Sequence, residues 1–132
     1  MKVRCFEATI VFFLLMATTY AWAADQKFNS GIKLLNACEV YEKASATNFK
    51  ELHDAFDVGY CMGIVAGISS TQIIYSEYLP KDFKEKVCWP DGTSNAQNIR
   101  VVMKYLRDHP AELHLPDSLL IIRAFREAYG CK

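Results

Sequence analysis

The first residues that could do chemistry in this chain are a histidine and two carboxylates close together in the sequence. His53, Asp54 and Asp57 form this group, and His53 and Asp57 stand four residues apart, so they share one face of a helix. A histidine–carboxylate pair can orient a general base. Nothing nearby in the sequence serves as an activated nucleophile or an oxyanion site. The pattern therefore favours a solvated helix face over a catalytic site.

The other two histidines, His109 and His114, flank a proline at position 110. His109 precedes this proline at the end of a predicted helix, where a partly positive imidazole interacts favourably with the helix dipole. No third ligand suggests itself for a metal. Structural capping is therefore the preferred interpretation, and the sequence predicts no catalytic residue, no cofactor and no metal site.

Residues 1–23 have the organisation of a secretory signal peptide. Lys2 and Arg4 supply the positive start, residues 10–17 are apolar, and Ala21 and Ala23 are the small residues that a signal peptidase requires. The apolar stretch is short for a membrane span. We expect cleavage after Ala23, a periplasmic location, and a single mature domain at 24–132 that is free of the membrane.

Four cysteines remain after that cleavage: Cys38, Cys61, Cys88 and Cys131. An even number of cysteines in a small exported domain predicts two disulfides. The chain has no C-x-x-C or H-x-x-x-H pair, and its cysteines are widely spread, so a zinc site is disfavoured.

The spacing of apolar residues is helical almost throughout the mature chain. It predicts helices over about 29–43 and 49–75, a third from the Ser94 cap to Asp108, and a fourth that opens at Pro116 and closes at Gly130. Thr47 or Asn48 is the expected cap of the second helix, and a short helical turn is expected at 81–86. The fold class is therefore all-α, a small disulfide-stapled bundle of four main helices.

The second predicted helix has no charged residue from Val58 to Ser76 and carries Gly59, Gly63 and Gly67 on one face. A helix that is apolar all round is usually a buried central element. A transmembrane helix is the alternative, since G-x-x-x-G is also a membrane-dimer pattern, but four consecutive polar residues at 69–72 oppose it. We expect a buried helix whose glycines allow another backbone to pack closely.

The short break after the first helix predicts an antiparallel hairpin with the second. In such a hairpin Cys38 and Cys61 would be offset by on the order of 10 Å, whereas a disulfide needs Cα atoms within about 7 Å. The nested pairing, Cys61–Cys88 with Cys38–Cys131, is therefore preferred over Cys38–Cys61. The crossed pairing, Cys38–Cys88 with Cys61–Cys131, stays open.

The chain carries fifteen basic and fifteen acidic residues, so it implies no basic face and no nucleic-acid partner. Aromatic residues gather around the long irregular stretch after the second helix, and aromatic residues are good anchors for a protein partner. Packing of these rings onto the core is an equal alternative. The predicted partner-binding residues are Tyr75, Tyr78, Trp89 and Asp91.

Taken together, these segments resemble the Rap1a/Tai family of type VI secretion immunity proteins. The resemblance rests on Cys38, Y-C-M-G-I-V-A-G-I at 60–68, C-W-P-D-G-T at 88–93, K-Y-L-R-D-H-P-A-E-L-H at 104–114 and the closing A-x-x-E-A-Y-G-C. It covers about residues 31–131. The chain departs from the family pattern in the cysteine inside G-Y-C-M-G, in Tyr129-Gly130 where Phe-Pro is common, and in Leu115-Pro116-Asp117 after the H-P segment.

The resemblance implies that the chain acts by binding and is not an enzyme. Family members lie in the periplasm, inhibit a cell-wall amidase delivered by neighbouring cells, and often form homodimers. The alternative function is a small periplasmic helical chaperone or stress protein with no toxin partner, and a small hydrolase that uses His53 is a weaker hypothesis. No inhibitory residue is carried over from the family.

Overall fold

The computed structural model describes residues 29–44, 51–80 and 86–131. Three sequence predictions fall outside these ranges: the signal peptide, the cap at Thr47 or Asn48, and all but the last residue of the turn at 81–86. The described residues all belong to the predicted mature domain, 24–132, and cover part of it.

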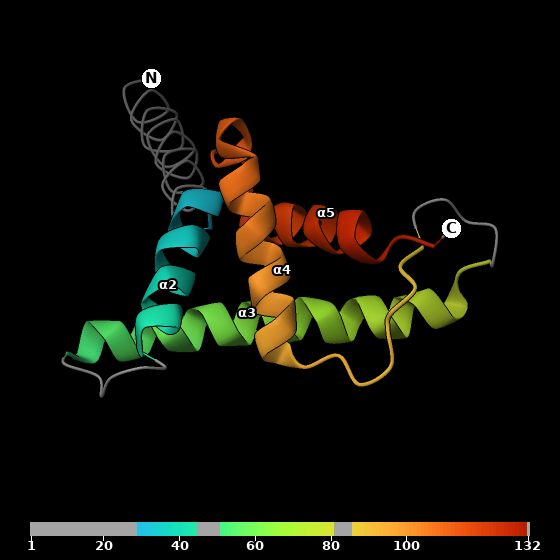
Figure 1. Ribbon diagram of the computed structural model, residues 1–132, viewed down its shortest axis with the longest axis horizontal. Helices are drawn as coiled ribbons and strands as arrows, with labels where there is room; N and C mark the ends of the chain where they lie inside the picture. Colours follow the sequence, from blue (N-terminus) through green and yellow to red (C-terminus); the bar gives the residue numbers. More distant parts are fainter. Residues whose placement is uncertain (1–28, 45–50, 81–85, 132) are drawn as a thin grey trace, which may run out of the picture.

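Four α-helices make up the described part of the chain, which confirms the predicted all-α class. They are α2 (Gly31–Ala44), α3 (Leu52–Tyr78), α4 (Asn95–Asp108) and α5 (Asp117–Tyr129), with the short 3-10 helix η1 (Pro110–Glu112) between the last two. The two steep helices α2 and α4 stand across the long helix α3, and α5 extends from α4 above the second half of α3 (Figure 1).

The helix ends follow from local sequence. The Ser94 hydroxyl caps α4 by accepting the backbone N–H of Gln97 at 3.2 Å, as the capping spacing predicts. The helix α4 ends at Asp108 because a residue that precedes proline, here His109, disfavours helical backbone. Before α4, the Asp91-Gly92 turn requires a left-handed residue, and Gly92 has φ of 74°.

The core lies where the four helices meet, and each helix contributes one apolar face to it. Its largest fully buried side chains are Leu34, Val65, Ile99, Val102, Met103, Leu106, Leu120, Ile121 and Phe125. The faces of α4 and α5 in this core are the ones that their apolar spacing predicts. Both helices are therefore amphipathic, with charged residues on their outer sides.

The long helix α3 is buried on one side only, which corrects the expectation of a fully buried helix. Val58, Cys61 and Val65 face the core, whereas Met62 is 42 % exposed and Ile74 is 62 % exposed. The helices α2 and α4 cross α3 steeply (Figure 1), so each covers a limited length of it. An apolar composition on all sides therefore leaves α3 with an exposed apolar face.

Among the described residues, no other backbone packs against the glycine stripe of α3. A Cβ atom added at Gly59, Gly63 or Gly67 would meet nothing within 4 Å. The close approach occurs instead at Gly31, the first residue of α2, where an added Cβ would overlap the Leu120 side chain and lie 3.1 Å from the Leu113 carbonyl oxygen. The absence of a side chain therefore matters at the start of α2.

The disulfide pairing predicted from the sequence is wrong. The bonds are Cys38–Cys61, with Cα atoms 5.1 Å apart, and Cys88–Cys131, with Cα atoms 5.0 Å apart. In an antiparallel hairpin that enters the second helix at residue 49, Cys38 and Cys61 would lie too far apart to bond. The observed helix α3 begins at Leu52, and α2 stands steeply across it (Figure 1), so the two cysteines lie at the crossing.

Candidate partner-binding surface

Most of the exposed large apolar side chains of the described residues lie on α3. They are Leu52, Phe56, Met62, Ile73, Ile74, Tyr75 and Tyr78. Exposed apolar surface of this kind can mark sites of protein or membrane interaction. By length and composition α3 could also cross a membrane, a test that the core helix of a soluble protein passes as well. We refer to the exposed surface of α3 as the apolar face.

A cleft of about 520 Å³ separates the last turns of α3 from the segment that leads into α4. On the α3 side it is lined by Ile73, Ser76 and Glu77, and on the other side by residues 86–93 and Asn98. Such a cleft combines an apolar wall with charged and polar groups. We call this hollow the 73–93 cleft.

The C-terminal end of the chain holds residues 86–88 in place. Val87 and Gly130 form an antiparallel bridge, in which the Cys88 N–H donates to the Tyr129 carbonyl at 2.7 Å and the Cys131 N–H donates to the Lys86 carbonyl at 3.2 Å. The Cys88–Cys131 disulfide closes the same contact covalently. One wall of the cleft is therefore a short extended segment anchored to the end of α5.

The structure separates the four predicted partner-binding residues into two groups. Tyr75, Tyr78 and Asp91 are exposed, and Tyr78 is 82 % exposed. Trp89 instead packs against the core, with its ring 4.9 Å from that of Phe125 and 5.3 Å from that of Tyr129. Trp89 and Asp91 line the 73–93 cleft, whereas the two tyrosines lie on α3 outside its lining.

Two buried polar atoms of residues that line the 73–93 cleft have no hydrogen-bond partner among the described residues. They are the indole Nε1 of Trp89 and the side-chain oxygen Oδ1 of Asn98, a residue that is 4 % exposed. Leaving a buried polar group unsatisfied costs about 1–3 kcal/mol. Asn98 lies among the buried, mostly apolar residues of α4. A polar residue at a buried helix position is the sequence feature that could have indicated the cleft.

The His53–Asp57 group is structural, and the prediction of a solvated face is wrong for Asp57. Its carboxylate is buried, accepts a bond from the Lys33 ammonium at 2.7 Å and lies 3.3 Å from Nδ1 of the exposed His53. The Lys33 ammonium also lies 5.9 Å from the centre of the Phe56 ring. This ion pair joins α2 to α3 beside the apolar face.

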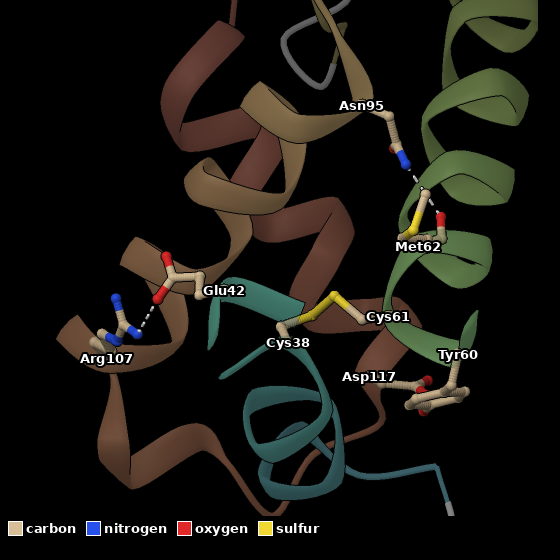
Figure 2. Close-up of a disulfide and its surroundings, with 8 residues drawn as sticks. All are labelled: Cys38, Glu42, Tyr60, Cys61, Met62, Asn95, Arg107 and Asp117. Carbon is tan, nitrogen blue, oxygen red and sulfur yellow. Dashed lines mark hydrogen bonds and ion pairs between the residues drawn. A yellow bond between two sulfur atoms is a disulfide. The ribbon is translucent and has the colours of Figure 1, made fainter. Parts of the chain in front are cut away.

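A second buried carboxylate joins α3 to α5. The Tyr60 hydroxyl donates a hydrogen bond to Asp117, which is 3 % exposed and lies in the first turn of α5. Burial and the Asp117 carboxylate raise the pKa of Tyr60 well above its usual range, so the phenol keeps its proton and remains a donor. Figure 2 shows this pair beside the Cys38–Cys61 disulfide.

Polar contacts also fix α4 against its neighbours. Arg107 pairs with Glu42 of α2 at 2.9 Å, and the Asn95 amide donates to the Met62 carbonyl of α3 at 3.3 Å (Figure 2). The position of α4 places Asn98 in the lining of the 73–93 cleft. The cleft geometry therefore depends on contacts made at both ends of α4.

The Y-L-R-D-H-P segment is a joint between α4 and α5. The His109 ring stacks on Tyr105 at 4.0 Å, while Glu112 accepts bonds from the Tyr105 hydroxyl at 2.9 Å and from Arg123 at 2.8 Å. These two donors lower the pKa of Glu112. His114 contacts the Ala111 carbonyl oxygen at 3.0 Å. Both histidines therefore have structural contacts at this joint.

The described residues place no catalytic constellation or metal site at either surface. No group of three histidine, cysteine or carboxylate side chains in the described ranges could hold a metal ion. The apolar face and the 73–93 cleft lie next to each other, because Ile73 belongs to both.

Comparison with known proteins agrees with a binding role. The family model of the Rap1a immunity proteins matches residues 30–131. No curated protein and no solved structure matches the chain. The matched range contains both disulfides, all four helices and both candidate surfaces. The chain belongs to the Rap1a immunity protein family.

Proposed function

We propose that this chain is a periplasmic immunity protein that binds and inhibits a peptidoglycan amidase delivered by a type VI secretion system. The family match over residues 30–131 carries this proposal. The signal-peptide pattern of residues 1–23 and the two disulfides favour the periplasm, which is an oxidising compartment. Cleavage after Ala23 would leave residues 24–132 as a single domain.

The exposed end of α3 supports inhibition by occlusion. Tyr75 and Tyr78 project from the last turns of this helix, and Asp91 lies across the adjacent cleft. Exposed aromatic side chains on a rigid helix anchor protein partners at low entropic cost. We propose that these residues contact the amidase and cover its active site.

The test measures the activity of purified type VI cell-wall amidases on isolated peptidoglycan in the presence of this protein. We expect stoichiometric protein to suppress the release of new amino groups. Replacing both Tyr75 and Tyr78 by alanine should raise the concentration needed for half-inhibition at least tenfold, because two aromatic anchors are lost.

The Leu52→Ala variant is the matched control, because Leu52 is equally exposed at the opposite end of α3. It should inhibit like the unmodified protein. Full amidase activity in a tenfold excess of the protein, together with no protection of cells that export the amidase to their periplasm, would sink the proposal.

We also propose that the glycine-bearing middle of α3, residues 59–67, pairs two copies of the chain. Its support is the uncharged run from Val58 to Ser76 and the three glycine positions at which an added Cβ would meet none of the described residues. Small residues on a shared face allow two helices to approach closely. A second copy packed there would cover the exposed Met62 and leave Tyr75 and Tyr78, near the end of α3, free for the amidase.

Sedimentation measures this pairing directly. The unmodified protein should sediment as a dimer, and the Gly63→Glu variant as a monomer with the same helical circular dichroism. The variant should still fold because a Cβ at Gly63 meets nothing within 4 Å. A monomeric unmodified protein at high micromolar concentration would refute the pairing.

A further inference from the structure

We infer that the 73–93 cleft receives a lysine or arginine side chain of the partner protein, held between the carboxylates of Glu77 and Asp91. The inference rests on the proposed function for its partner, and it deepens that function by assigning a basic residue to the partner's contact surface. Glu77 lies on the α3 side of the cleft, and Asp91 belongs to the segment on the other side. Both residues are exposed, so a side chain can reach them from solvent.

The carboxylates of Glu77 and Asp91 are unpaired within the described part of the chain. No ion pair joins either of them to a basic side chain there. Glu42 and Glu112, by contrast, each pair with an arginine, at 2.9 Å and 2.8 Å respectively. Two unpaired negative charges that line one cleft are complementary to a positive group on a partner.

Lys86, the basic residue of the same lining, does not neutralise these carboxylates. Its ammonium donates instead to the Leu79 carbonyl at 3.3 Å. The buried unpaired groups of the lining, the Trp89 indole N–H and the Asn98 side-chain oxygen, are dipoles of opposite sign. Two full negative charges against one positive charge therefore leave the cleft with a negative potential.

The position of Glu77 makes its charge unfavourable for the folded chain alone. Glu77 lies in the last turn of α3, and that turn contains no basic residue. The C-terminus of a helix carries about half an elementary negative charge, so it repels a carboxylate. Sequences that break such a local rule do so chiefly at functional sites. A cation supplied by a partner would relieve the repulsion between Glu77 and the end of α3.

The size and the apolar walls of the cleft suit a long basic side chain. Lysine and arginine have an aliphatic stem that packs on apolar surface while the charged head stays with polar groups. Ile73, which is 44 % exposed, and the exposed Pro90 are the lining residues available to such a stem. The cleft volume of about 520 Å³ leaves room for the charged head. Tyr75 and Tyr78 lie just outside the lining, where they would contact the partner around its basic residue.

A short peptide tests this site without an amidase. The probe is acetyl-Leu-Arg-Leu-amide, and its control replaces the arginine by citrulline, which has nearly the same shape and no charge. Added to the isotope-labelled protein, the arginine peptide should shift the backbone amide NMR signals of Glu77, Asp91 and Gly92 in a saturable way. The citrulline peptide should bind about fivefold more weakly, because the charge-assisted contacts with two carboxylates are lost.

Neutral variants of the carboxylates provide the second measurement. Replacing Glu77 by glutamine and Asp91 by asparagine together should make the two peptides bind equally weakly. Glu77→Gln alone should raise the midpoint of thermal unfolding, because it removes a charge that opposes the helix dipole, whereas loss of a structural contact would lower it. The matched control is Glu51→Gln, since Glu51 is an exposed carboxylate at the opposite end of α3. This control should bind the arginine peptide as the unmodified protein does.

Three results would each overturn the inference: no saturable binding of the arginine peptide, equal affinity for the two peptides, or undiminished binding by the Glu77→Gln, Asp91→Asn double variant. None of these measurements involves an amidase. A protein that inhibits amidases but binds both peptides alike would therefore disprove the basic-residue contact alone. Selective binding of the arginine peptide without inhibition of any amidase would disprove the proposed target alone.

Discussion

Replacing both Cys38 and Cys61 by alanine should lower the free energy of unfolding by about 3–5 kcal/mol. The disulfide closes a separation of 23 residues, and the chain-entropy model gives about 3 kcal/mol for a loop of that size. The remainder is lost packing, since both cysteines are fully buried where α2 crosses α3. Urea unfolding followed by circular dichroism measures the change, and a loss below about 1 kcal/mol would contradict it.

The second disulfide provides the comparison. Cys88 is exposed and Cys131 is half-buried, whereas Cys38 and Cys61 have no exposed surface. Thiol–disulfide exchange requires access to a sulfur atom. Mild reduction of the folded protein followed by alkylation should therefore label Cys88 and Cys131 first. Equal labelling of all four cysteines, or a peptide map with Cys38 bonded to Cys131, would contradict the structure.

The sequence predicts the helices well because their signals are local. The Ser94 cap, the break at Pro110 and the apolar stripes of α4 and α5 each act within a few residues. The number of helices and the fold class follow from such features. Exposed Tyr75 and Tyr78 also lie where a partner-binding surface was predicted, although binding itself stays a prediction.

The disulfide pairing could not be predicted because it depends on the angle between helices. Cys38–Cys61 is excluded in a parallel-axis hairpin and is favourable where α2 crosses α3 steeply. Helix-crossing angles are set by side-chain packing between residues far apart in sequence. The crossing angles also explain why the side of α3 that bears Gly59, Gly63 and Gly67 is exposed. A helix that crosses α3 steeply, as α2 and α4 do, covers a shorter length of it than a parallel helix would.

The role of Asp57 was hidden for a related reason. Its neighbours in sequence suggest a polar helix face, but its ion-pair partner Lys33 is 24 residues away on α2. The 73–93 cleft likewise combines the end of α3, an irregular segment and α4. Sequence periodicity describes one helix at a time, so a site built from three separate segments gives little pattern to detect.

Substituting Lys33 by methionine should destabilise the protein by about 2–4 kcal/mol, because it leaves the Asp57 carboxylate buried without its cation. The Asp57 side chain is 6 % exposed, and the remaining neighbour, His53, is 72 % exposed to water. Methionine retains the apolar stem of Lys33 beside Phe56, so the change isolates the charge. Urea unfolding again provides the measurement.

Two further variants determine whether the buried charge is the cause. Lys104→Met removes the cation of the i, i+4 pair with Asp108 on the surface, where both side chains are largely in water, and it should have no measurable effect. Adding Asp57→Leu to Lys33→Met should restore most of the lost stability, because an apolar pair carries no desolvation cost. If the double variant were as unstable as Lys33→Met alone, the loss would come from packing between α2 and α3 and the ion pair would have no part in it.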